Sequence, residues 1–275
     1  MSGIFNFFDY NSPGPGVPKD EPAKPRIIVF IQIYLRKFWN LVKVNALFFF
    51  FNIPALVLVI FSFVIFLGFQ GNLAQGTFMR SMIFLSFSSF FMSVPVITSG
   101  PAQAGFTYIL RNYSMQKHAF IWSDFIEYTK NNFKQAILIS AIDIFALLFV
   151  FVDIYLYTIS SMNGFFISIF AYFISLLLII FLMMHLYIYP MLVTFKLSLK
   201  QIYKNAFLLA LLKFLPNIGI LFVCFVISAM PFFIIPAAAI ILFPIITLST
   251  VGLITNFYVY PILEKFMIKV VSKKT

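Results

Sequence analysis

Six long apolar stretches are the feature that most restricts the fold of this chain. They cover residues 41–69, 81–98, 136–158, 165–193, 206–230 and 236–260. A helix needs about 20 apolar residues to cross the hydrocarbon core of a bilayer. Only 10% of the residues are charged, whereas a soluble domain carries about 25%. The pattern therefore predicts an all-α fold, a polytopic membrane bundle of six transmembrane helices.

The residues before the first stretch differ from the rest of the chain. Residues 1–26 contain no apolar core of the signal-peptide type and include the turn-forming run Ser-Pro-Gly-Pro-Gly at 12–16. We expect them to form an uncleaved cytoplasmic tail. Residues 27–275 are then expected to form a single membrane domain. Within it, Pro54 predicts a kink in the first span, and Pro236 suits the first turn of the sixth.

The distribution of basic residues predicts the orientation of the bundle. Of the 19 Lys and Arg residues, only Arg80 lies in a loop on the opposite side. The others precede the first span, follow the sixth, or lie in or beside the loops after the second and fourth spans. Because basic residues are retained in the cytoplasm, both termini are predicted to be cytoplasmic. The net charge of +11 is thus explained by basic residues near the anionic lipid headgroups of the cytoplasmic side, rather than by nucleic-acid binding.

Three amphipathic segments lie on the predicted cytoplasmic side, at 27–43, 122–135 and 196–204. The first predicts an interfacial helix over 27–40, before the first span. The second provides candidate docking residues, namely Trp122, Asp124, Phe125 and Lys134. These segments either anchor the protein to the membrane surface or form a docking platform for a cytoplasmic partner, and the two roles are compatible.

Polar residues inside the predicted spans are candidates for function, because lipid makes them costly. Asp143, His185 and Lys213 are expected at about the same depth in the third, fourth and fifth spans. Asp143 and Lys213 are predicted to be able to pair. Such a pair either fixes the register of two helices or takes part in a proton or ion relay, and the structural role is favoured.

The run from Val94 to Gly105 is the most distinctive local motif. Its notable residues are Pro95, Thr98, Gly100, Pro101 and Gly105. We expect the second span to end here and a new helix to begin near Pro101. The exposed N–H groups of that helix start could hold an anion. The favoured alternative is that the small residues let two helices approach closely.

Signatures of enzymes are missing from the sequence. It contains no GK[ST] phosphate-binding loop and no HExxH motif. The isolated His118 and His185 cannot form a zinc site by themselves. We therefore expect no enzymatic activity, no cofactor and no bound metal. The oligomeric state is not indicated by any pattern.

Several short motifs follow one another in a fixed order along the chain. They are FDYNSPGPGV at 8–17, RKFWNLVKVN at 36–45, the stretch at 95–105, WSDF at 122–125, NFKQ at 132–135 and KNA at 204–206. Together they resemble the YesL-like family of bacterial integral membrane proteins, a domain of unknown function. The resemblance implies a multi-pass protein of the bacterial cytoplasmic membrane.

The resemblance also implies a function. Members of this family are associated with carbohydrate uptake, which implies a non-enzymatic accessory protein beside an ABC-type sugar importer. Its partners would be the lipid bilayer and importer subunits. The alternative is a small secondary transporter or channel that uses Asp143, His185 and Lys213. A membrane-bound sensor is a third alternative, ranked last because no output domain is recognisable.

Overall fold

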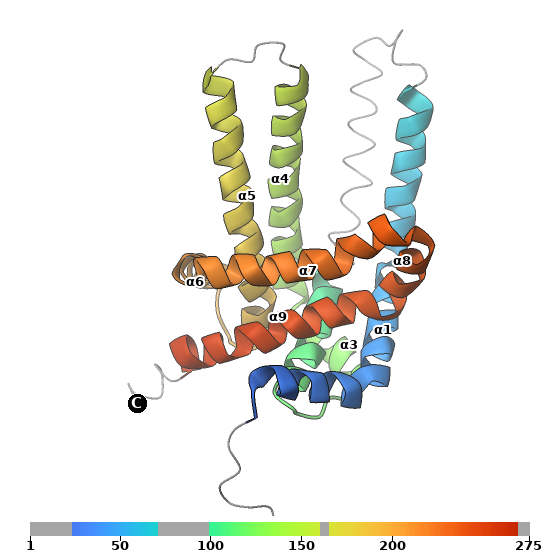
Figure 1. Ribbon diagram of the computed structural model, residues 1–275, viewed down its shortest axis with the longest axis vertical. Coiled ribbons are helices and arrows are strands. Elements are labelled where there is room, and N and C mark those ends of the chain that lie inside the picture. The colour runs from blue at the N-terminus through green and yellow to red at the C-terminus, as the bar shows by residue number, and fades with distance from the viewer. Residues whose placement is uncertain (1–23, 71–98, 160–164, 269–275) are drawn as a thin grey trace, which may run out of the picture.

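The protein was analysed as a computed structural model, which describes residues 24–70, 99–159 and 165–268. Every regular element within these ranges is a helix (Figure 1). The helices are α1 (Arg26–Gln70), an unlabelled helix over residues 99–114, α3 (Ile121–Asn131), α4 (Phe133–Ile159), α5 (Phe165–Leu192), α6 (Leu199–Leu212), α7 (Phe214–Ile234), α8 (Pro236–Leu242), the π-helical turn η3 (Phe243–Thr247), α9 (Leu248–Leu263) and η4 (Glu264–Ile268). The all-α prediction is confirmed for this part of the chain. The predicted second span at 81–98, with Pro95 and Thr98, lies outside the described residues, as does most of the tail at 1–26.

Helix α1 combines two segments that the sequence suggested separately. The expected interfacial helix at 27–40 and the first expected span at 41–69 belong to one continuous helix, with Pro54 inside it. Figure 1 shows that α1 changes direction along its length. Its first part lies across the base of the molecule, and the remainder rises toward the top. The first part therefore keeps the transverse placement expected of an interfacial segment without a break in the helix.

Helices α4 and α5 form an antiparallel pair that stands upright on the base (Figure 1). Both are strongly apolar, with no acidic residue in the first turn and no basic residue in the last. Many of their large apolar side chains are exposed, including Phe145, Ile169 and Phe170. Since these side chains have no protein neighbour to cover them, they suit an apolar solvent such as lipid.

The predicted fifth span at 206–230 is not one straight helix. Helix α6 ends at Leu212 and α7 begins at Phe214, and the two helices are bent by 97° relative to each other. Pro216 supplies a physical reason, because it has no N–H group to donate to the carbonyl of Leu212. The side-chain amide of Asn217 adds hydrogen bonds at the end of α6, with Nδ2 at 3.1 Å from the Ala210 carbonyl and 3.3 Å from that of Leu209, which also accepts from the Lys213 N–H.

The predicted sixth span at 236–260 is also divided. It begins at Pro236 as expected, but the π-helical turn η3 interrupts it before α9. Asn45 of α1 satisfies backbone groups at this interruption. Its Nδ2 donates to the Phe243 carbonyl at 3.1 Å, and its Oδ1 accepts from the Ser249 N–H at 2.7 Å. A buried side chain of α1 thus holds the irregular turn in place.

The buried core divides into two clusters. One lies between α4, α5, α6 and α9 and includes Tyr187, Ile188 and Ile202. The other lies between α1, the helix at 99–114 and α3, and includes Leu41 and Phe125. Gly252 of α9 connects the two regions, because a Cβ there would collide with the side chain of Leu110. Both clusters belong to the base of the molecule rather than to the upper ends of the upright helices.

The apolar helices indicate a membrane protein. Among the described residues, Tyr172–Leu192 and Phe243–Met267 are long and apolar enough to cross a bilayer, and the bent pair α6–α7 would be a third candidate if it forms one span. Figure 1 shows α7 and α9 running across the direction of α4 and α5 rather than beside it. The number of six spans and the cytoplasmic position of both ends stay predictions.

Candidate functional site

An ion pair joins the upright helices α4 and α5. His185 Nε2 lies 2.8 Å from Asp143 Oδ1, and each side chain is 25% exposed. The other ring nitrogen, Nδ1, lies 3.0 Å from the carbonyl oxygen of Phe181, one turn earlier on α5. Both nitrogens face acceptor oxygens, an arrangement that the doubly protonated ring satisfies with two N–H donors. The pair is therefore a candidate proton-binding site between two apolar helices.

Lys213 does not join this pair. The predicted contact between Asp143 and Lys213 is replaced by the contact with His185, because α5 is the direct neighbour of α4. Lys213 lies instead at the junction of α6 and α7, where its Nζ is 5.9 Å from the centroid of the Phe266 ring. The structure thus brings together two members of the predicted polar cluster and leaves the third elsewhere.

Asn217 is a polar centre that the sequence analysis missed. Its Oδ1 accepts hydrogen bonds from Tyr187 Oη at 2.6 Å and from Tyr258 Oη at 2.8 Å. Together with the two carbonyls bound by its Nδ2, these contacts connect α5, α6, α7 and α9 at one buried side chain. A signal was present in the sequence, since Pro216 and Asn217 are adjacent within an apolar run.

Two glycines of the motif at 95–105 lie in close helix contacts. A Cβ on Gly100 would collide with Ser140 Oγ and with the backbone of Ala136 on α4. A Cβ on Gly105 would collide with the carbonyl oxygen of Phe125 and lie 2.5 Å from Thr129 Oγ1 on α3. These contacts are those that the close-packing interpretation requires. Pro101 lies in the same helix, over residues 99–114.

The four candidate docking residues have different environments. Trp122 is 65% exposed and Lys134 is also exposed, so both are available to a partner. Asp124 accepts a hydrogen bond from the Phe120 N–H at 2.9 Å and thereby stabilises the start of α3. Phe125 is 0% exposed and packs against Phe51 at a centroid distance of 5.2 Å. Phe125 is therefore a core residue, and its expected role in docking is wrong.

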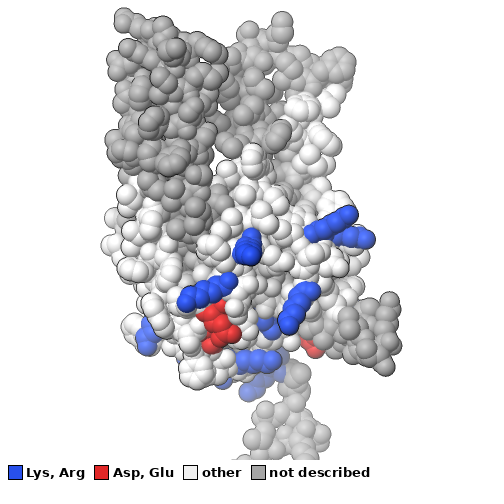
Figure 2. Space-filling model, turned by 180° about the vertical axis from the view of Figure 1, so that it is seen from behind, with Lys and Arg blue, Asp and Glu red and all other residues white. Residues whose placement is uncertain are grey.

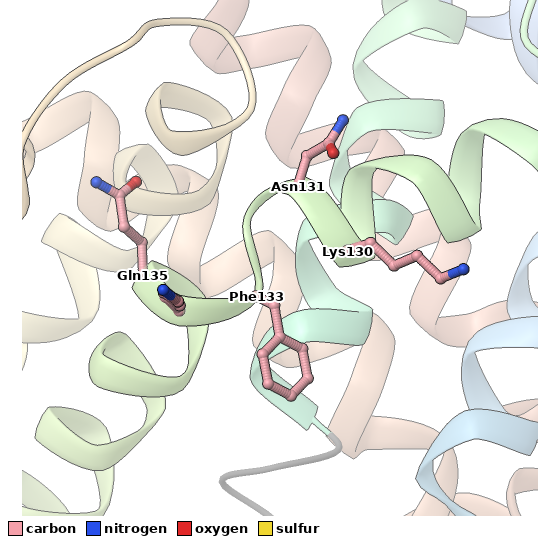
Figure 3. Close-up of a pocket in the computed structure, with 5 residues that line it drawn as sticks. Lys130, Asn131, Phe133 and Gln135 are labelled. Atoms are coloured by element: carbon pink, nitrogen blue, oxygen red, sulfur yellow. The ribbon is translucent and has the colours of Figure 1, made fainter.

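A hollow of about 430 Å³ lies where α3 meets α4 and is lined by Lys130, Asn131, Phe133, Lys134 and Gln135. Figure 3 shows that its labelled side chains diverge, with the Lys130 and Gln135 side chains directed to opposite sides. Polar groups that bind a small molecule converge on it. The hollow therefore offers no ready-made ligand site. Within the described ranges there is also no group of three or more His, Cys, Asp or Glu residues that could hold a metal ion.

The charged surface is concentrated toward the base. On the face seen in Figure 2, Lys and Arg side chains gather over the lower half, with the acidic side chains among them. The described surface above them is uncharged in this view. The base is therefore the part of the described molecule where a charged partner, or the headgroups of a membrane, would make polar contacts.

The comparison with known families agrees with the motifs. Residues 41–154 match the family described as a protein of unknown function, DUF624. The matched residues resemble a DUF624 domain over less than half of the chain. YesL-like proteins carry DUF624, so the resemblance to that family is confirmed. The DUF624 match includes Gly100, Gly105 and Asp143 but ends before His185 and Lys213.

No curated protein and no solved structure matches the chain significantly.

Proposed function

We propose that the protein is a non-enzymatic accessory subunit of a bacterial carbohydrate ABC-type importer. In this proposal six spans hold it in the cytoplasmic membrane with both termini in the cytoplasm, and it binds importer subunits through the base. The family resemblance suggests the importer. The observation that supports a docking role is an uncovered apolar surface on α1.

This surface, the α1 stripe, consists of Ile27, Ile31, Leu35 and Trp39, spaced four residues apart on the first part of α1. These side chains are 65%, 49%, 69% and 73% exposed, respectively. Residues four apart share one face of a helix, so they form a continuous strip. The opposite face is covered by protein, as the 1% exposure of Ile33 shows. A helix face of this kind is suited to an apolar groove in a partner.

Basic residues beside the α1 stripe define the chemistry of the partner. Arg36 and Lys43 are both exposed on the same helix. The complementary surface is therefore an apolar groove bordered by acidic side chains. Trp122 of α3 is a second exposed tryptophan, and its ring lies 6.5 Å from that of Phe51, farther along α1 than the stripe. Exposed tryptophans are typical anchors of protein interfaces.

Site-specific photo-crosslinking tests this proposal. A photoreactive amino acid at position 39 or 122, in the full chain at its native expression level, is expected to capture importer subunits identified by mass spectrometry. The control position is Phe225, which is 61% exposed on α7 and does not belong to the α1 stripe. Absence of importer subunits from positions 39 and 122, or equal capture at 225, would sink the proposal.

A second candidate function is a small secondary transporter, favoured by the pair of Asp143 and His185. A proton-binding site between two apolar helices is the element that a proton-coupled carrier requires. Flux of radiolabelled sugars and of protons into liposomes that contain the purified protein tests it. Asp143→Asn is expected to reduce flux at least tenfold, whereas Lys213→Gln, whose side chain lies by Phe266 and not in the pair, should leave flux unchanged. A purified protein that moves no solute contradicts this candidate.

A further inference from the structure

Arg111 occupies an unusual position at the end of the helix over residues 99–114. Its side chain is half-buried, and its Nη1 donates to the carbonyl oxygen of Val193, just beyond the end of α5, at 3.2 Å. Its Nε is buried and has no hydrogen-bond partner. Buried donors are almost always paired, so an orphan on a guanidinium indicates a partner that the protein itself does not supply.

The charge of Arg111 is also uncompensated. Within the described part of the chain, no carboxylate forms an ion pair with it. The ionisable groups that act on it most strongly are the phenols of Tyr108, Tyr128 and Tyr260. The C-terminus of α5 contributes only about half a negative charge. A desolvated cation without a full counter-charge is costly, so the site favours an anion.

One edge of the guanidinium makes no hydrogen bond to the described residues. Nη1 is taken by Val193, whereas neither Nε nor Nη2 donates to any described residue. These two nitrogens form the side-on edge of the fork, which matches two oxygens of a phosphate or carboxylate.

The nearby tyrosines add a neutral donor to this edge. Tyr108 and Tyr128 stack with a centroid distance of 3.3 Å, and the Arg111 guanidinium lies 5.8 Å from the Tyr108 ring. Burial raises the pKa of Tyr128 to about 12, and its hydroxyl shares a hydrogen bond with that of Tyr108, so the neutral pair keeps one O–H for an anion. Three helices and the end of α5 thus surround one cation with aromatic hydroxyl groups.

We propose that Arg111 is the centre of a binding site for a phosphate-type anion, held by the Nε–Nη2 edge and by one O–H of the paired Tyr108 and Tyr128. Two sources supply this chemistry, the phosphodiester of a lipid headgroup and soluble phosphate. The site lies apart from the α1 stripe and does not depend on the importer proposal.

Thermal unfolding of the purified full chain in a phosphate-free maltoside detergent tests the site. The protein is titrated with dioleoyl phosphatidylglycerol and, separately, with sodium phosphate against sodium chloride at equal ionic strength. The readout is the ligand concentration at half-maximal rise in Tm. We expect Arg111→Gln to raise this concentration at least tenfold. Arg111→Lys keeps the charge but loses the fork, so a several-fold rise is expected. Lys117→Gln is the matched control, since Lys117 is exposed and belongs neither to this site nor to the α1 stripe, and should change it less than twofold.

The possible outcomes distinguish a lipid headgroup from soluble phosphate, and one of them refutes the proposed site. An Arg111-dependent response to the lipid alone assigns a headgroup phosphate, and a response to sodium phosphate assigns a soluble phosphate. Equal responses of the wild type and both Arg111 variants to both ligands would overturn the proposal. If circular dichroism shows that Arg111→Gln does not fold, the proposed site is tested by comparing the wild type with Arg111→Lys.

Discussion

Tyr187 donates a hydrogen bond to Asn217 across 2.6 Å, between two side chains that are both 0% exposed. Asn217 accepts a second hydrogen bond from Tyr258 and uses its amide N–H groups on carbonyls at the end of α6. The sharp turn between α6 and α7 is thus stabilised by one side chain that also fixes two neighbouring helices. The apolar segment at 206–230 consequently has a defined bent shape in place of a straight span.

Replacement of Asn217 by Ala is expected to destabilise the protein strongly. The substitution removes the acceptor of two tyrosine hydroxyls and the side-chain donor to the Ala210 carbonyl, and an unpaired buried polar group costs about 1–3 kcal/mol. We expect a loss of at least about 2 kcal/mol, measured by thermal or denaturant unfolding in detergent. The matched control is Asn131→Ala on the exposed side of α3. A loss no larger than that of the control would refute the role assigned to Asn217.

Alanine substitutions at Gly105 and at Gly219 should have opposite effects on stability. Gly105→Ala forces a methyl group against the carbonyl oxygen of Phe125, and overpacking of this kind costs about 1–3 kcal/mol. Gly219→Ala in α7 meets nothing within 4 Å and should stabilise its helix by about 0.5–1 kcal/mol. Unfolding midpoints of both variants check this. Equal effects of the two substitutions would contradict the close approach at Gly105.

A double-mutant cycle tests the pair of Asp143 and His185. Each single variant, Asp143→Asn or His185→Gln, leaves its former partner in apolar surroundings without its charge complement. The double variant removes both charges, so its loss of stability should be smaller than the sum of the two single losses, by about 1 kcal/mol. The same cycle with Lys213→Gln in place of His185→Gln should show additive losses. Coupling of Asp143 to Lys213 instead would mean that the helices pack differently.

The two aromatic residues near the start of α3 should respond differently to truncation. Phe125→Ala removes a fully buried ring from the core, and such substitutions cost about 3–5 kcal/mol. Trp122 is 65% exposed, so Trp122→Ala should change the free energy of unfolding by less than about 0.5 kcal/mol. Unfolding curves measure both. A large loss at Trp122 would show that its ring belongs to the core and not to an available surface.

Parts of the fold could be predicted from local patterns. The ends of the apolar runs gave α4 and α5 to within a few residues, because lipid-exposed helices are selected by composition along the chain. Pro236 marked the start of α8 correctly. The bend at Lys213 was missed, because proline is tolerated in apolar helices, and the hydrogen bonds by which Asn217 stabilises the end of α6 cannot be recognised from spacing alone.

The candidate site, like the fold, could be predicted from the sequence only in part. Asp143, His185 and Lys213 could be selected as polar residues in apolar runs, and the first two form a contact. Their pairing could not be predicted, since it depends on which helices are neighbours and on where α6 ends. Arg111 was counted only as one of many basic residues in the sequence. Its missing counter-charge becomes visible when α5 and the tyrosines of three other elements are placed around it.

The sequence by itself determined that the chain is an all-α protein with helices apolar enough for a membrane, because a chain with 10% charged residues cannot cover itself with a polar surface. It also provided the family resemblance, and the DUF624 match covers the motifs at 95–105, 122–125 and 132–135. Only the tertiary structure decided the partner of Asp143, the burial of Phe125 and the bend before Asn217. Transfer of a segment into lipid is a property of its own residues, whereas the partner of a buried polar group is set by helices that are distant in sequence and adjacent in space.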